Sequence, residues 1–347
     1  MPSRNPSLLL PWTLAAFFLA FLAAAAEKPV GLRQKLWTVD DGLPNNNVNA
    51  LALSDDGYLW VATVNGLARF DGQRFEVFDV RRVPEFSTSD IISFLPTRRN
   101  GLLFLARTGL WMQRFDDGTF ATRFDLVNID AWMEDDTGRT WVVRDGGRLQ
   151  EVLPGGFGPP APEPRIAGQP IFASGRPGPT VFRDGRWQEL RDGAWVPVGD
   201  LPALPAHRNS WQVQRHASGS WFMTDQAVCR LIDGRTPLVT FQQPGVTDRV
   251  SMLAECTNGD ACVTVYGGRA FLLDGKTGRP EAVRDPDGNR IVDASSMLMD
   301  GDGNLWIGTV SRGLLRLSPN HFETRGASDG FPSEHLTTVA TRREGGL

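Results

Sequence analysis

The sequence has few of the residues on which metal sites and acid–base catalysis most often depend. It contains four histidines and three cysteines among 347 residues. It has no CxxC pair, no HExxH motif and no Cys/His spacing of a zinc site. A zinc enzyme or a histidine-dependent nucleophilic enzyme therefore has no support. We expect no metal and no other cofactor.

Excess positive charge is also lacking. Lysine and arginine number 36 against 40 aspartate and glutamate residues, which gives a formal net charge of −4. No run of basic residues marks a surface that would follow a phosphate backbone. We therefore do not expect the protein to bind nucleic acids generally.

The chain has only one long apolar run, from Leu8 to Ala26. The run follows Arg4, and Ala24 with Ala26 forms an A-x-A cleavage pattern before Glu27. This arrangement predicts a signal peptide over residues 1–26 and a periplasmic location. The alternative is an uncleaved membrane anchor, because roughly 19 apolar residues just cross a bilayer.

Glycine and tryptophan are plentiful, at 37 and 11 residues, and they recur at intervals of 37 to 44 residues. Each copy has a turn glycine followed three residues later by an apolar anchor. The glycines are Gly57, Gly101, Gly138, Gly178, Gly219, Gly259 and Gly303, and Gly345 begins an eighth copy. The anchors are Trp60, Phe104, Trp141, Val181, Phe222, Cys262 and Trp306.

A unit of about 40 residues with four short strand-like runs is typical of a propeller blade. We therefore predict an all-β fold, a β-propeller of seven four-stranded blades over residues 32–331, with six or eight blades as alternatives. The glycines and the tryptophans of the clearest copies are assigned to turns and to packing between blades. The strands expected in the first blade are Val48–Leu53, Tyr58–Thr63, Leu67–Phe70 and Phe75–Asp79.

The two ends of the repeat region correspond to each other. Residues Gln34–Pro44 align with Phe322–Pro332, and both segments end in a DGLP-like phrase. Residues 34–38 are therefore expected to form an outermost blade strand that helps to close the ring. Residues 332–347 match the start of a further blade, which predicts that the sequence is part of a longer receptor.

The repeats resemble the two-component regulator propeller repeats. Residues Asp41–Phe75 read DGLPNNNVNALALSDDGYLWVATVNGLARFDGQRF, and residues 300–322 and 329–347 repeat the phrase. The resemblance covers about residues 32–347 and is weakest around Val181 and Cys262, where the tryptophan is replaced. It implies the periplasmic sensor region of a bacterial signal-transduction receptor. Relatives of this kind continue to a histidine kinase or diguanylate cyclase domain, and some bind oligosaccharides.

Other chemical interpretations of the turns are weaker. DGDGN at Asp300–Asn304 and DPDGN at Asp285–Asn289 begin like calcium loops, but they lack the glutamate at loop position 12. A glycan hydrolase or lyase with Asp-box-like turns is the alternative function, although glycoside hydrolysis needs two converging carboxylates. Residues for a quinone cofactor cannot be assigned, and the GH…WD signature of WD40 repeats is absent. No catalytic domain is recognisable.

A ligand is expected at the mouth of the propeller opposite the Asp-Gly turns, where polar side chains suit a small molecule or an oligosaccharide. The alternative is that these are ordinary solvated loop residues. A homodimer is possible, and membrane association is expected only through missing C-terminal parts or an uncleaved N-terminal segment. The candidate ligand-binding residues are Asn46, Asn47, Asn65, Arg107, Arg144, Asp225, Tyr266 and Arg312.

Cys256 and Cys262 flank TNGDA, a turn-forming segment, so they can face each other across a hairpin. An oxidising periplasm permits a disulfide between them. The alternative is two small buried residues on neighbouring strands.

Overall fold

The computed structural model describes residues 31–320, with gaps at 55, 85, 87, 96–100, 108, 115–119, 126–128, 136, 146, 154–155, 163–170, 174–176, 184–185, 200–209, 217–218, 225–227, 233–235, 242–249 and 257. The predicted signal peptide and the further blade over 332–347 lie outside the described residues. Leu32–Ser318 forms one compact unit. No helix of the described residues is long and apolar enough to cross a membrane.

The described residues of Leu32–Ser318 form seven four-stranded sheets, numbered blades 1 to 7 below. Within each sheet, strands that follow one another in the chain pair antiparallel. Blade 1 contains β2 (Val48–Leu53), β3 (Leu59–Thr63), β4 (Gly66–Phe70) and β5 (Phe75–Phe78); blade 2 contains β6 (Ile91–Leu95), β7 (Gly101–Ala106), β8 (Gly109–Arg114) and β9 (Phe120–Asp125); blade 3 contains β10 (Ile129–Glu134), β11 (Thr140–Arg144), β12 (Arg148–Leu153) and β13 (Gly156–Phe157).

The remaining blades follow the same order. Blade 4 contains β14 (Ile171–Ala173), β15 (Thr180–Arg183), β16 (Arg186–Arg191) and β17 (Ala194–Val198); blade 5 contains β18 (Ser210–His216), β19 (Gly219–Thr224), β20 (Val228–Ile232) and β21 (Thr236–Phe241); blade 6 contains β22 (Val250–Glu255), β23 (Ala261–Val265), β24 (Ala270–Leu273) and β25 (Pro280–Ala282); blade 7 contains β26 (Ala294–Met299), β27 (Leu305–Thr309), β28 (Leu314–Pro319) and β1 (Leu32–Trp37).

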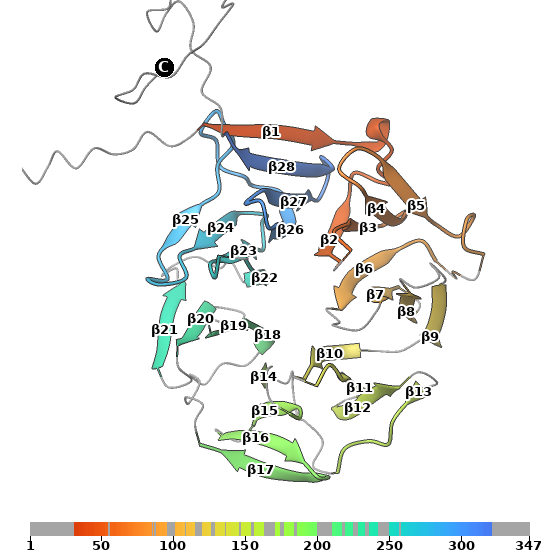
Figure 1. Ribbon diagram of the computed structural model, residues 1–347, viewed down its shortest axis with the longest axis vertical. Helices are drawn as coiled ribbons and strands as arrows, with labels where there is room; N and C mark the ends of the chain where they lie inside the picture. The colour runs from red at the N-terminus through yellow and green to blue at the C-terminus, as the bar shows by residue number, and fades with distance from the viewer. Residues whose placement is uncertain are drawn as a thin grey trace, which may run out of the picture. The chain divides into compact units, whose positions relative to one another are not determined.

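The seven sheets follow one another around a ring, with the first strand of each at the centre and the later strands successively farther out (Figure 1). The prediction of an all-β propeller is confirmed. The N-terminal strand β1 pairs with β28 and completes blade 7, so the expected closing role of residues 34–38 is confirmed as well. A short 3-10 turn, Val39–Asp41, then leads the chain into blade 1.

Aromatic packing holds the closing strand in place. Trp37 at the end of β1 is 2% exposed. Its ring stacks on Trp306 of blade 7 at a centroid distance of 5.4 Å and meets the edge of Phe70 of blade 1 at 5.1 Å. Because Trp37 contacts both the first and the last blade, its burial couples the two ends of the ring.

The turn between the first two strands of a blade forms as the repeat predicts. Gly57 and Gly303 have φ values of 85° and 78°, a region that a residue with a side chain rarely adopts. Each glycine donates its amide to the residue three positions earlier, Ser54 and Asp300 respectively. The tryptophan that follows, Trp60 or Trp306, is buried between its own blade and the next.

Three of the weaker anchor assignments do not match the position that Trp60 occupies in blade 1. In blade 1 the tryptophan Trp60 lies three residues before Thr63, which pairs with the first residue of β2. In blade 2, Ala106 pairs with the first residue of β6. The residue three positions before Ala106 is Leu103, which packs toward blade 3. The predicted anchor Phe104 instead packs in the core shared with Trp60, toward the preceding blade.

In blades 4 and 5 the predicted anchors, Val181 and Phe222, are likewise not at the position that Trp60 occupies in blade 1. Val181 packs against Trp141 of the preceding blade. In blade 5 the equivalent position is Trp221 rather than Phe222, and Trp221 packs against Val250 of blade 6. Successive strand residues point to opposite faces, so a slip of one residue exchanges the two neighbouring blades.

Candidate functional site

The strand order places the candidate ligand-binding residues at one end of the sheets. We call this end the loop face; it carries the segments that enter each inner strand and the turns between the second and third strands. The glycine turns at Gly57, Gly138, Gly259 and Gly303 lie at the opposite end. Asp225 lies outside the described residues. The described candidates on the loop face are Asn46, Asn47, Asn65, Arg107, Arg144, Tyr266 and Arg312.

Two of the candidate arginines are held by aspartates that the sequence reasoning did not single out. Arg107 Nε donates to Asp90 at 2.8 Å. Arg312 donates through Nε at 2.7 Å and through Nη2 at 2.5 Å to the two carboxylate oxygens of Asp293. In both blades the aspartate directly precedes the inner strand, and the arginine follows the second strand. This recurrence in the repeat is the signal by which sequence alone could have found the pairs.

The other polar candidates mainly support the loops themselves. Asn46 accepts the amide of Val39 on its side-chain oxygen at 3.0 Å, and its backbone carbonyl accepts the amide of Gly313 at 3.0 Å. Arg144 donates to Gln150 at 2.7 Å and lies over the Phe157 ring at 4.3 Å. These contacts stabilise the ring closure and blade 3.

The two remaining asparagines make local backbone contacts. The amide of Asn47 donates to the Asn45 side chain at 2.7 Å. The amide of Asn65 donates to the Thr63 hydroxyl at 3.2 Å, and the residue is exposed in the turn between β3 and β4.

Three exposed apolar residues lie on the segments that carry the Arg312–Asp293 pair or approach them. Tyr266 is 63% exposed, Val292 58% and Val310 51%. The backbones of these segments meet, since the amide of Val310 donates to the Asp293 carbonyl at 2.9 Å. A Cβ placed on Gly268, two residues after Tyr266, would lie 2.5 Å from the Val292 carbonyl oxygen. We call Tyr266, Val292, Asp293, Val310 and Arg312 the loop cluster.

The loop cluster combines a rigid cation with apolar surface. The hydrogen bonds that Arg312 donates to Asp293 raise the pKa of Arg312 above its usual value, against the opposing effect of burial, and the charge of the nearby Asp285 carboxylate acts in the same direction. The guanidinium is thus always charged and held in one plane by a bidentate partner. A flat aromatic ring, two valines and a fixed donor group are the elements that bind a small polar ring.

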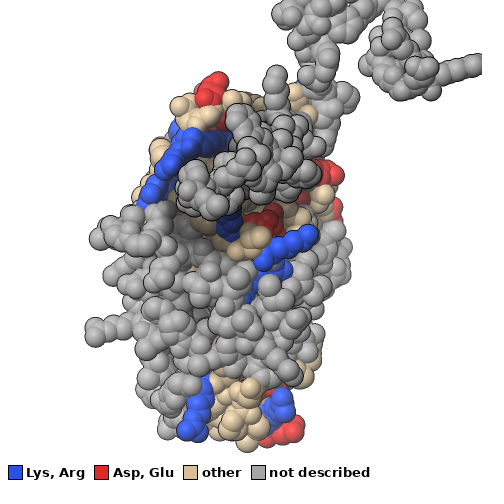
Figure 2. Space-filling view, turned by 90° about the vertical axis from the view of Figure 1, so that its left-hand side faces the viewer, with Lys and Arg blue, Asp and Glu red and all other residues tan. Residues whose placement is uncertain are grey.

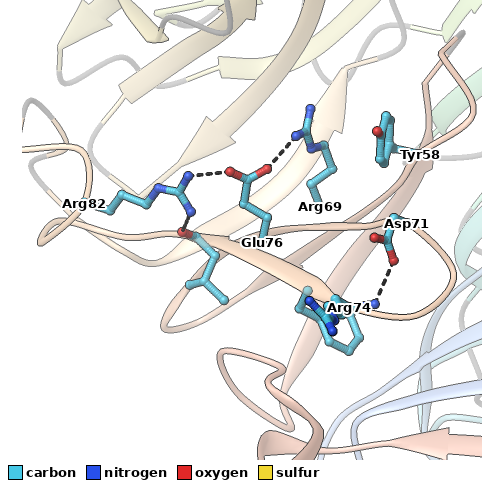
Figure 3. Close-up of a pocket in the computed structure, with 8 residues that line it drawn as sticks. Tyr58, Arg69, Asp71, Arg74, Glu76 and Arg82 are labelled. Atoms are coloured by element: carbon cyan, nitrogen blue, oxygen red, sulfur yellow. Dashed lines mark hydrogen bonds and ion pairs between the residues drawn. The ribbon is translucent and has the colours of Figure 1, made fainter.

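A second feature is a hollow of about 470 Å³ on blade 1, which Figure 3 shows from close by. Glu76 lies between two arginines: Arg69 donates to it at 2.5 Å, and Arg82 donates to its other oxygen. The guanidinium of Arg69 also lies over the Tyr58 ring at 4.5 Å. The residues lining the hollow are Tyr58, Arg69, Asp71, Arg74, Phe75, Glu76, Val77 and Arg82.

The two carboxyl groups of this hollow are both held in the ionised form. Backbone amides of Arg74 and Gln73, each 2.7 Å from Asp71, lower the pKa of that carboxyl. Burial alone would raise the pKa of Glu76, but the hydrogen bond from Arg82 and the charge of Arg69 lower it. A glycosidase general acid needs a raised pKa, so this pair of carboxylates does not have the properties of a hydrolytic site.

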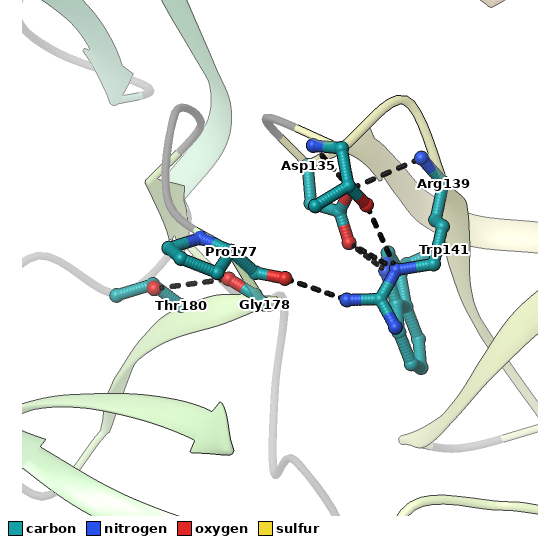
Figure 4. A network of polar contacts seen from close by, with 7 residues as sticks. Asp135, Arg139, Trp141, Pro177, Gly178 and Thr180 are labelled. Carbon is teal, nitrogen blue, oxygen red and sulfur yellow. Dashed lines mark hydrogen bonds and ion pairs between the residues drawn. The ribbon is translucent and has the colours of Figure 1, made fainter. Parts of the chain in front are cut away.

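The acidic turns serve the fold. Asp300 accepts the Trp306 indole at 2.7 Å and the Asn304 side chain at 2.9 Å on the same oxygen, while its other oxygen accepts backbone amides. In blade 3, Asp135 accepts the Trp141 indole and Arg139 Nε, both at 2.9 Å (Figure 4). Among the described residues, no group of three His, Cys, Asp or Glu residues is arranged to hold a metal ion.

The charges on the surface are mixed. On the side of the molecule seen in Figure 2, the basic and acidic side chains of the described residues lie among one another. Arg69 and Arg82 are paired with Glu76, and Arg312 is paired with Asp293. The positive charge of each of these arginines is therefore offset by a neighbouring carboxylate.

Comparison with known proteins supports the repeat assignment. The family model described as two component regulator propeller matches residues 42–65 and 285–311. The first segment covers the inner strands of blade 1, and the second covers those of blade 7. No curated protein matches the chain by sequence.

Solved structures share the fold. The extracellular domain assigned to hybrid two component system BT3049 of B. thetaiotaomicron is 15% identical, with a TM-score of 0.62 over 84% of this chain. The present chain spans only 42% of that domain. Virginiamycin B lyase from Staphylococcus aureus is 11% identical, with a TM-score of 0.61 over 83% of this chain and 99% of the lyase. YCF48 from Cyanidioschyzon merolae is 11% identical, with a TM-score of 0.55 over 84% of this chain and 100% of YCF48.

Proposed function

Because the chain carries two component regulator propeller repeats, we propose that it is the ligand-sensing propeller of an exported bacterial signal-transduction receptor. The observation that carries the proposal is the position of the two matched segments. They contain the inner strands of blades 1 and 7, the blades that β1 joins when the ring closes. The fold shared with an extracellular domain of a hybrid two component system supports export.

The loop cluster is the place where we propose that the ligand binds. Tyr266 offers an exposed ring, and Val292 and Val310 extend its apolar surface. Arg312 uses Nε and Nη2 for Asp293, so the other nitrogen of its guanidinium can donate to a ligand. A sugar ring has an apolar face that stacks on an aromatic side chain and hydroxyls that accept from arginine, so a small molecule or oligosaccharide fits this chemistry.

The test compares Tyr266→Ala with Tyr266→Phe in the full chain. Binding of an oligosaccharide panel is measured by the shift in melting temperature, and hits are titrated by calorimetry. Tyr266→Ala is expected to weaken binding about tenfold, about 1.4 kcal/mol, while Tyr266→Phe keeps the stacking surface and most of the affinity. Equal affinity of all three proteins would exclude Tyr266 from the site.

The same panel tests the alternative of a propeller lyase or hydrolase acting on glycans, for which the fold shared with a lyase is the supporting observation. Reaction products are assayed in parallel with the melting shifts. A sensor binds and releases its ligand unchanged. Product formed by the wild-type chain, and lost in a binding-deficient variant, would overturn the sensor proposal in favour of the enzyme.

A further inference from the structure

Among the described residues, three blades close their first turn with a hydrogen bond between side chains six residues apart. The later residue is the tryptophan that packs toward the next blade, and the earlier residue accepts its indole N–H. The distances are 3.0 Å from Trp60 to Ser54, 2.9 Å from Trp141 to Asp135 and 2.7 Å from Trp306 to Asp300. We call the two positions the turn pair. Because the indole is partly or wholly buried, an acceptor at the earlier position is needed to satisfy it.

In blade 6 the turn pair is Cys256 and Cys262. Cys262 lies three residues before Val265, which pairs with the first residue of β22, as Trp306 lies three before Thr309 in blade 7. The backbone of the turn is also the same. The amide of Cys256 donates to the Asp260 carbonyl at 2.8 Å, as Asp300 donates to Asn304 at 3.0 Å. The two cysteines therefore replace the acceptor and the indole together.

The two sulfur atoms are close and shielded from water. Cys256 is 1% exposed and Cys262 is fully buried, in a cluster that contains Met297 and Ile307 of blade 7. Both are free thiols in the structure, with their Sγ atoms 3.0 Å apart. A thiol is a weak donor and a weak acceptor, so as a dithiol this pair holds the turn less firmly than a carboxylate and an indole do.

We propose that Cys256 and Cys262 form a disulfide that closes the turn between β22 and β23 covalently, at the position where blades 1, 3 and 7 use a hydrogen bond from an indole. The sulfur atoms must approach by on the order of 1 Å to reach bonding distance. Each thiol gives up a proton, and the pair gives up two electrons to a disulfide oxidant, which is reduced to two thiols.

The bond forms before the turn is fully packed. The hydrogen bond with Cys256, together with burial, raises the pKa of Cys262, so its thiolate is scarce in the folded protein. Exchange requires a thiolate, and the oxidant must reach the sulfur atoms, so an open turn during folding is the reactive state. Formation in the cell requires the export proposed above, whereas formation in a glutathione buffer does not depend on it.

The first experiment maps the cysteines of the full chain, both recovered from the periplasm and refolded in a mixture of oxidised and reduced glutathione. The protein is alkylated in denaturant without a reductant and digested with trypsin. Cys256 and Cys262 lie together in the peptide 250–269, and Cys229 lies in 216–230. The expected result is a 250–269 peptide without alkyl groups and lighter by two hydrogen atoms, beside an alkylated 216–230 peptide.

The second experiment measures the melting temperature with and without dithiothreitol. Reduction is expected to lower the wild-type value by on the order of 5 °C. The variant Cys256→Ser/Cys262→Ser should show no such response, and Cys229→Ser should respond like the wild type. Alkylation of both Cys256 and Cys262 in the refolded and the periplasmic protein, or a disulfide that includes Cys229, would overturn the proposal. A bond formed in glutathione but absent from periplasmic protein would argue against export and leave the disulfide assignment standing.

Discussion

The substitution Asp135→Asn tests whether the turn pair stabilises the propeller. Both oxygens of Asp135 are in use. One accepts the Trp141 indole and Arg139 Nε, each at 2.9 Å. The other accepts the amides of Thr137 and Arg139, each at 3.0 Å, and the Thr137 hydroxyl at 2.6 Å. Asparagine keeps one acceptor oxygen and turns an NH₂ group toward the donors that remain.

The size of the effect follows from which donors lose their acceptor. If the amide oxygen keeps the two backbone donors, the buried indole of Trp141 is left unpaired, which costs about 1–3 kcal/mol. Loss of the charge weakens the remaining hydrogen bonds. The pair with Arg139, whose side chain is 38% exposed, contributes at most about 1 kcal/mol after screening by solvent. We expect a total loss of about 3 kcal/mol, or roughly 6–12 °C in melting temperature.

The assay is urea and thermal unfolding of the full chain at pH 7. Asp302→Asn is the matched control, because Asp302 occupies an exposed position in the equivalent turn of blade 7 and should change the free energy of unfolding by less than about 0.5 kcal/mol. If Asp135→Asn is as stable as this control, the turn pair does not stabilise the blade and the reasoning is refuted.

The pH dependence gives a second, independent measurement on the same variant. Burial alone would raise the pKa of Asp135, but hydrogen bonds from Thr137, Trp141 and Arg139 lower it below the ordinary value. A carboxyl with a lowered folded-state pKa stabilises the protein above its unfolded pKa of about 4, and this contribution is lost as the pH falls through the folded-state value. The stability difference between wild type and Asp135→Asn should therefore be constant at neutral pH and shrink below about pH 4.

Two further substitutions test the closure of the ring by urea unfolding. Gly313→Ala should lower the free energy of unfolding by about 2–4 kcal/mol, because Gly313 has a φ of 103° and a Cβ there would lie 2.2 Å from the Trp37 carbonyl oxygen. The control Gly301→Ala, with open space around its Cβ, should be nearly neutral. Equal effects of the two substitutions would contradict the argument. Trp37→Ala should cost about 3–5 kcal/mol, since the ring is buried between Trp306 and Phe70, and a loss below about 1 kcal/mol would show that β1 is not needed for closure.

Much of the propeller was predictable because the information is local and repeated. A turn glycine and a tryptophan three residues later act within one hairpin, so Gly57 with Trp60 and Gly303 with Trp306 could be recognised without knowing their neighbours. The alignment of the two chain ends predicted the role of β1, because both segments carry the same repeat phrase. The weaker copies failed at Phe104 and Phe222, because Gly101 and Gly219 each lie one residue later in the paired strands than Gly57 does in blade 1, and this slip reverses the face. Val181 also faces the preceding blade.

The candidate site was predictable only in part. The repeat placed Arg107 and Arg312 at the loop face, but their partners Asp90 and Asp293 lie 17 and 19 residues away in sequence. Contact between them depends on where the inner strand begins relative to the turn between the second and third strands. Tyr266 could be identified as an exposed aromatic residue, whereas the close approach of Gly268, two residues later, to the Val292 backbone is set by tertiary packing.

The repeat, the turns and the strand that closes the ring follow from the amino-acid sequence alone, because each depends on a backbone conformation or a hydrophobic period that a few neighbouring residues impose. The blade that each anchor faces, and the arginines that are already bound to a carboxylate, became known from the packing of the blades. The tertiary structure also showed that Cys256 and Cys262 occupy the place of an acceptor and an indole. These contacts join strands and loops whose separation from one another is set by strand register and by packing between blades. No short segment of the sequence determines either of these.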